Sequence, residues 1–151
     1  MTRFEEYRAA LSAAMCVADL DQLDLLLQKI RSDSIGYIEK TEGNVLPTFE
    51  FTFCYNRSDY EALSARHGAD ARNTYGISIG TVRGRNLIFI DLETPLKLLR
   101  SENPNRNFIV NVTLVIFEEL LHVLYPQLSE TDIDVRTNQL VESFLGIRIE
   151  M

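Results

Sequence analysis

The chain has 151 residues, of which 46% are hydrophobic, so it is long enough for one globular domain with its own core. Its 22 acidic and 15 basic residues give a formal net charge of −7. This balance excludes a general nucleic-acid binder, because such a protein needs a basic face for the phosphate backbone.

A long helix is predicted over residues 3–31, because its apolar residues recur on one helical face. A break near Asp19 is the alternative within that segment. The alternation in TFEFTFCY then predicts a half-buried strand over 49–55. We assign no chemistry to the first helix, whose pattern is typical of a helix that covers a sheet or joins a bundle.

A short helix is predicted over 58–67. Ser58 and Glu61 have the spacing of a capping box, and Gly68 is a typical helix stop. His67 then stands at the C-terminal cap, which favours a capping role for this histidine over a ligand role.

A pair of strands is predicted over 75–92, with its turn at residues 83–86. Gly76, Ser78 and Gly80 fall on one face of the first strand. Such a bare face suits the close approach of another backbone.

A short helix and a strongly apolar long helix follow the hairpin. Thr94 as the cap and Pro95 at the first helical position predict the short one. The long helix is predicted over about 105–124 and is closed by Pro126, because proline disfavours helical backbone in the residue before it.

The last helix is predicted over 129–145, with Ser129 as its N-terminal cap and Gly146 as its end. This order of elements predicts an α+β fold in which helices cover a small mixed sheet. We expect a single domain, with the N-terminal helix and its connection in 1–44 and the core in 45–146.

A soluble, cytoplasmic protein is predicted. The N-terminus, MTRFEEYRAALSAAM, carries acids where a signal peptide needs a basic start and an apolar run. No stretch approaches the ~20 apolar residues that cross a bilayer, so no membrane partner is expected. Cys16 and Cys54 lack CxxC spacing and stand among apolar residues, which favours two buried free thiols over a disulfide.

Glu118, Glu119 and His122 interrupt the apolar helix over 105–124. Glu118 and His122 are four residues apart and share one face, at ~100° of rotation per residue. A helix that is apolar nearly all round is buried, and a bare buried carboxylate costs several kcal/mol unless it is paired or binds a metal. The pattern therefore indicates a metal site.

Two other interpretations of these residues stay open. The acids can mark the point where the helix emerges into water, with His122 packed in the core. Alternatively, the three side chains form a buried hydrogen-bond network without any metal.

The segment EELLH, Glu118–His122, resembles the HExxH helix of zinc metalloproteases of the zincin type. The order of a strand, a helix, a two-strand element, the motif helix and a further helix is similar to that of compact gluzincins. The resemblance covers roughly residues 45–146. It implies a zinc-dependent metallopeptidase that acts on a peptide or protein substrate.

The resemblance assigns roles to each residue of the motif. His122 matches the second ligand histidine, and Glu119 matches the general base that takes a proton from water and passes it to the leaving amine. Glu118 stands where the first ligand histidine is expected. A carboxylate binds zinc, but its negative charge weakens the Lewis acidity of the ion, so reduced activity, a different metal and loss of catalysis are all compatible with this substitution.

The third zinc ligand is expected on the last helix. DVRTNQLV, which begins at Asp134, resembles the ExxANxFA pattern of compact gluzincins, so Asp134 is the expected ligand, with Glu130 as the substitute one turn earlier. The alternative for both acids is an ordinary interaction with the helix dipole.

In these proteases the extended substrate adds to the edge of the sheet as an extra strand, and residues 76–80 are the expected edge here. Tyr125 is a candidate for stabilising an oxyanion, although packing is the alternative. A second function from another class is a catalytically inactive zincin-fold protein that uses its groove to bind a partner.

Overall fold

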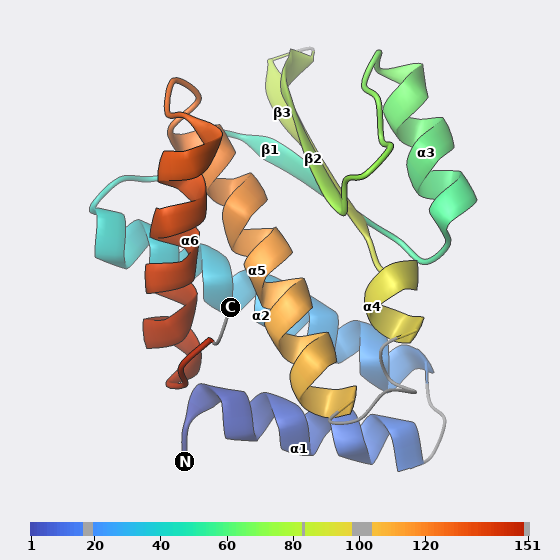
Figure 1. The fold of residues 1–151 in the computed structure, drawn as a ribbon, viewed down its shortest axis with the longest axis vertical. Helices are drawn as coiled ribbons and strands as arrows, with labels where there is room; N and C mark the ends of the chain where they lie inside the picture. The colour runs from blue at the N-terminus through green and yellow to red at the C-terminus, as the bar shows by residue number, and fades with distance from the viewer. Residues whose placement is uncertain (17–19, 83, 98–103, 150–151) are drawn as a thin grey trace.

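The computed structural model describes residues 1–16, 20–82, 84–97 and 104–149. It has a mixed α+β fold in which helices surround a small sheet (Figure 1). Its elements in chain order are α1 (Arg3–Cys16), α2 (Leu20–Glu42), β1 (Phe49–Cys54), α3 (Arg57–Arg66), β2 (Gly76–Val82), β3 (Arg85–Asp91), α4 (Glu93–Lys97), α5 (Pro104–Leu124) and α6 (Glu130–Leu145).

Within the described residues, the sheet has three strands in the order β1-β3-β2. β1 runs parallel to β3, with Phe51 opposite Ile88, and β2 runs antiparallel to β3, with Ile77 opposite Phe89. β2 is therefore an edge strand, as expected for residues 76–80. β3 begins at Arg85, within the range predicted for the turn, and residue 83 lies outside the described residues.

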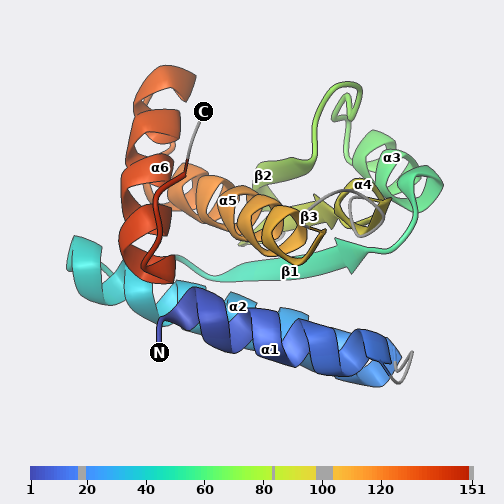
Figure 2. The same cartoon turned by 60° about the horizontal axis from the view of Figure 1, so that its bottom comes forward.

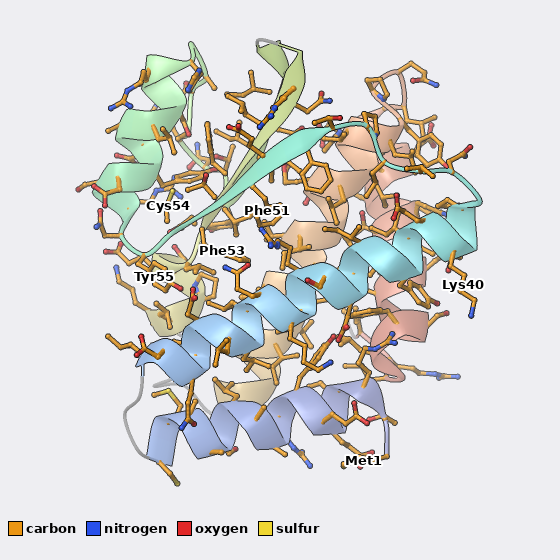
Figure 3. The ribbon with its side chains drawn as sticks, turned by 180° about the vertical axis from the view of Figure 1, so that it is seen from behind. Met1, Lys40, Phe51, Phe53, Cys54 and Tyr55 are labelled. Atoms are coloured by element: carbon orange, nitrogen blue, oxygen red, sulfur yellow. The ribbon has the colours of Figure 1, made fainter. Side chains whose placement is uncertain are left out.

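Helices cover the two faces of the sheet unequally. Helix α5 lies against β2 and β3, and α1, α2 and α6 pack around it to form the main core (Figure 2). Helix α3 covers the other face in a smaller cluster around Tyr60 and Phe89. Seen from behind, β1 runs above α2 in the view, and Phe51 and Phe53 of β1 pack against the main core (Figure 3).

The interior of the main core is dominated by α5. Its fully buried apolar side chains are spread around the helix, as its composition predicted; they are Phe108, Ile109, Val112, Ile116, Phe117, Leu120 and Leu121. Among the described residues, no helix is both long and apolar enough to cross a bilayer.

The N-terminal segment forms two helices, and the second is longer than predicted. Helix α2 continues to Glu42 instead of stopping at residue 31. Ser34 and Ile38 are fully buried in this extension, and Ser34 bonds the carbonyl of Ile30 with its own hydroxyl. Gly43 then ends the helix with a left-handed φ of 71°. Asp19, the alternative break point, lies outside the described residues.

The predicted cap of α3 is wrong by two residues. Asn56, not Ser58, accepts the backbone N–H of Asp59 at 2.8 Å and opens the helix. Both residue types cap helices well, so local spacing alone did not distinguish them. His67 is the C-terminal cap, as predicted.

The predicted cap of α4 is also wrong. Asp91, not Thr94, opens this helix: its Oδ1 accepts the N–H of Glu93 at 2.9 Å, and its Oδ2 accepts the Thr94 hydroxyl at 2.9 Å. Cys54 is a buried free thiol as predicted, but Cys16 is exposed at the end of α1.

Arg57 connects α3, the sheet and the loop before β2. Its guanidinium pairs with the fully buried carboxylate of Asp91 at 3.1 Å and donates to the carbonyls of Ala71 and Thr74, both at 2.6 Å. The loop therefore has a fixed position relative to the carboxyl end of β3.

We expect Arg57→Ala to lower the free energy of unfolding by about 3 kcal/mol, because it leaves the buried Asp91 carboxylate without its cation. Arg72→Ala is the matched control, since Arg72 and Asp70 form an exposed ion pair; its effect should be much smaller, because solvent screens this pair. Urea denaturation measures both. Equal effects of the two variants would contradict a structural role for the Arg57–Asp91 pair.

Candidate metal centre

A cleft of about 400 Å³ opens between the C-terminal half of α5 and the segment that leads into β2. The three polar α5 residues singled out in the sequence line this cleft, together with an acid of α6 and the loop before β2. The lining residues are Asn73, Thr74, Tyr75, Gly76, Val115, Glu118, Glu119, His122 and Glu130.

Gly76 allows β2 to lie directly against α5. A Cβ at this position would meet Val115 Cγ1 at 2.6 Å and Glu119 Cγ at 2.9 Å. The bare strand face therefore accommodates side chains of a helix, not the other backbone that we expected. Gly80 on the same strand has nothing within 4 Å of such a Cβ.

Glu119 is buried where β2 meets α5 at Gly76. The residue is 5% exposed, and its Oε2 is buried with no hydrogen-bond partner among the described residues. Burial raises the pKa of Glu119, and together with the negative charges of Glu118 and Glu130 it brings this pKa to about 8. A cation beside this carboxylate would offset the cost of its burial.

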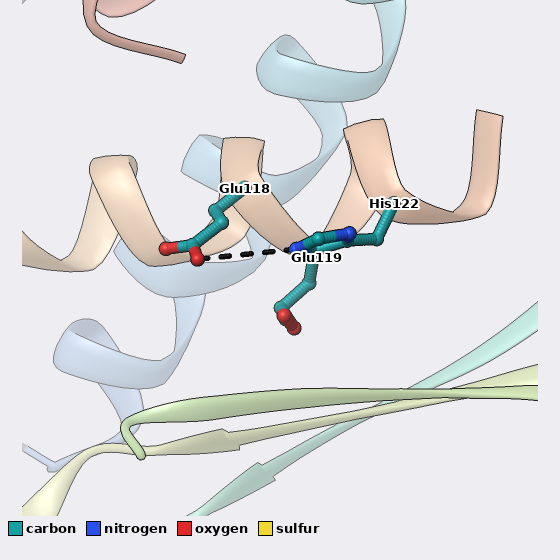
Figure 4. Close-up of side chains that lie close together, drawn as sticks. All are labelled: Glu118, Glu119 and His122. Carbon is teal, nitrogen blue, oxygen red and sulfur yellow. Dashed lines mark ion pairs between the residues drawn. The ribbon is translucent and has the colours of Figure 1, made fainter. Parts of the chain in front are cut away.

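Glu118 and His122 lie one turn apart above Glu119 (Figure 4). His122 Nε2 is 3.9 Å from Glu118 Oε1, and the two side chains are 18% and 37% exposed, respectively. Burial and the charge of Asp134 raise the pKa of Glu118, while His122 acts in the opposite direction. The motif thus lies at the wall of a cleft, where its side chains remain accessible to an ion.

The acid nearest to His122 on the last helix is Glu130, whose Oε1 lies 3.3 Å from His122 Nε2. Asp134 instead groups with Glu118 and Glu130, with one ligand atom of each within 4.8 Å of the others. Glu118, Glu119 and His122 form a second group by the same measure. The structure therefore brings both α6 acids to the motif and places Glu130, the substitute, beside the histidine.

Tyr125 lies away from these acids. It lines a separate cleft together with Glu42 and Arg136, whose side chains form a two-contact ion pair at 2.8 and 2.9 Å. Tyr125 also packs against the main core. This placement favours the packing interpretation of Tyr125.

The wall opposite α5 was not predicted. Asn73, Thr74 and Tyr75 form it, and Tyr75 is 52% exposed. Asn73 has a left-handed φ of 60°, a conformation that asparagine tolerates better than most residues. That tolerance is only a weak sequence signal for this wall, because hydrogen bonds from Arg57 of α3 fix the position of the loop.

A larger cleft of about 760 Å³ lies on the α3 side of the sheet. Its polar lining includes Glu50 and Arg85, which pair with each other at 2.8 Å. The smaller cleft is the better candidate, because it contains the buried carboxylate of Glu119 that has no partner.

No protein-family model, curated protein or solved structure matches the chain. The case for a function therefore rests on the site. Carboxylate oxygens and an imidazole nitrogen are suitable ligands for a divalent cation, and Glu119, whose Oε2 is unpartnered, belongs to one of these ligand groups. The residues present thus fit a divalent metal.

Gly76→Ala should lower the free energy of unfolding by about 1–3 kcal/mol, because the added methyl group forces β2 away from Val115 and Glu119. Gly80→Ala, on the same face of the same strand, should cost nothing or stabilise by up to ~0.5 kcal/mol. Chemical denaturation of both variants checks this difference. Equal stabilities would show that β2 moves away from α5 without cost.

In the presence of a chelator, stability should fall as pH rises from about 4.5 to about 8, because the folded state retains the Glu119 proton that the unfolded state has released. Above pH 8 this contribution is constant. Glu119→Gln should remove the slope and be the more stable protein at high pH, by up to roughly 5 kcal/mol. Glu6→Gln, at an exposed position of α1, is the control. Parallel pH profiles for wild type and Glu119→Gln would contradict the raised pKa.

Proposed function

We propose that this protein is a zincin-like metallopeptidase domain that hydrolyses peptide bonds with the aid of a divalent metal at the α5–α6 cleft. The observation that carries the proposal is the carboxylate of Glu119, which is buried beside Gly76 without a hydrogen-bond partner. A group of this kind is costly to keep unless it has a chemical task or an ion to face.

His122, Glu118 and an acid of α6 would hold the metal, with Glu130 the nearest acid to His122. When bound, a divalent cation supplies Lewis acidity, which polarises a substrate carbonyl and makes water more acidic. It also favours the charged form of Glu119. The Glu119 carboxylate would then take a proton from water and deliver it to the leaving amine.

The edge strand supports a peptide as the substrate. β2 has a neighbour on one side alone in the described sheet, so its other edge is available to pair with an extended chain. Its first residue, Gly76, touches Glu119. A peptide paired along residues 76–80 would therefore pass close to the proposed base.

Glu118 is the main departure from the metallopeptidase pattern and supports a second candidate. An anionic first ligand lowers the Lewis acidity of a single bound ion, and Glu119 with a pKa of about 8 is mostly protonated at neutral pH unless a cation is present. A non-catalytic protein that retains the fold and binds a partner at the β2 edge is compatible with both facts.

Metal analysis of protein purified without added zinc, combined with Glu118→His and a peptide-hydrolysis assay, separates the two. We expect metal in the wild type, and Glu118→His should raise zinc retention and hydrolysis because it restores a neutral ligand. Glu119→Gln should abolish hydrolysis but retain the metal, since it removes the base and keeps the cleft intact. If Glu118→His gains neither zinc nor hydrolysis, the binding-module function is the better one.

A further inference from the structure

The acids at the cleft form two ligand groups that share one residue. Glu118, Glu119 and His122 make the first group, and Glu118, Glu130 and Asp134 make the second. Within each group, one ligand atom of each residue lies within 4.8 Å of the others. Glu118 is positioned to contribute to both groups at once, because a carboxylate has two oxygens.

The charge of the cluster exceeds what one divalent cation neutralises. Glu118, Glu119, Glu130 and Asp134 carry four negative charges when ionised. In the described part of the chain, no lysine or arginine forms an ion pair with any of them. One divalent cation would leave two negative charges at the cleft and its exposed α6 rim, whereas two such cations would balance all four.

A feature beyond the number of acids distinguishes this cluster from a solvated helix surface. Glu119 is 5% exposed, and its Oε2 has no partner. It lines the same cleft as Glu118, His122 and Glu130. A surface cluster needs no buried, unpaired member, so the Glu119 oxygen is an independent observation that favours a cationic ligand at the cleft.

We propose that the cleft and its α6 rim bind two divalent cations, with Glu118 as the bridging carboxylate. The first position is ligated by His122 and lies beside Glu119, the proposed base, and the second is held by Glu130 and Asp134. The inference rests on the proposed function for its first position and adds the second. Apart from the His122 nitrogen, the ligand atoms would all be carboxylate oxygens, so the pair should prefer oxygen-binding ions such as Mn²⁺ to zinc. Two-metal sites place their ions about 3.5–4 Å apart.

A bridging role also accounts for glutamate at position 118. A terminal carboxylate gives its whole negative charge to one ion and weakens its Lewis acidity. A bridging carboxylate divides this charge between two ions, so each remains a stronger Lewis acid. The acid that departs from the single-zinc pattern is thus the residue that a two-cation site requires.

The test is a Mn²⁺ titration of the full chain by calorimetry, followed by electron paramagnetic resonance. We expect two Mn²⁺ per chain in the wild type, with a spectrum broadened by coupling between the ions. Asp134→Asn should bind one uncoupled Mn²⁺, and Glu118→Gln should weaken both binding events. Asp134 is exposed, so the first substitution leaves the core unchanged.

Asp132→Asn is the matched control, because this exposed acid of the same helix lines the separate Tyr125 cleft. It should retain both ions and their coupling. One Mn²⁺ in the wild type, unaffected by Asp134→Asn, would overturn the second position and leave the proposed function standing. Absence of any bound Mn²⁺ or Zn²⁺ would overturn both proposals.

Discussion

The buried position of α5 places a carboxylate where one of its oxygens is buried and has no hydrogen-bond donor among the described residues. Glu119 is on a helix whose other side chains are required for the core, so it cannot turn outward without exposing them. Gly76 brings β2 so close that the strand covers the carboxylate. The free energy gained by packing α5 thus sustains the unfavourable burial of Glu119, and this burial raises its pKa.

The opposite wall of the cleft depends on residues that are distant from the acids. Asp91 at the end of β3 is fully buried, caps α4 and pairs with Arg57 of α3. Arg57 in turn holds the carbonyls of Ala71 and Thr74, which position the loop beside Glu119. The cleft is therefore a product of both faces of the sheet, with α5 on one and α3 on the other.

The metallopeptidase and binding-module proposals rest on the same acids. The two proposals differ in the effect that they assign to the negative charge of Glu118. With one ion, Glu118 is a ligand that weakens catalysis and favours a binding module. With two ions, it joins the Glu119–His122 group to the Glu130–Asp134 group. Under these proposals, the number of bound cations would decide how the cleft is used.

Local patterns in the sequence were sufficient for the elements whose signals are contained within a few residues. The alternating strand at Phe49–Cys54, the apolar helix α5 and the Ser129 cap of α6 were predicted nearly to their ends. The proximity of Glu118 and His122 also follows from helical spacing alone.

Tertiary packing decided the rest. Helix α2 extends to Glu42 because Ser34 and Ile38 find buried positions, and Asp91 caps α4 because the ion pair with Arg57 places it there. The choice between Glu130 and Asp134 depends on the crossing of α6 over α5, and the loop around Asn73 depends on hydrogen bonds from α3. These are contacts between residues far apart in the chain, and no periodicity within a single segment encodes them.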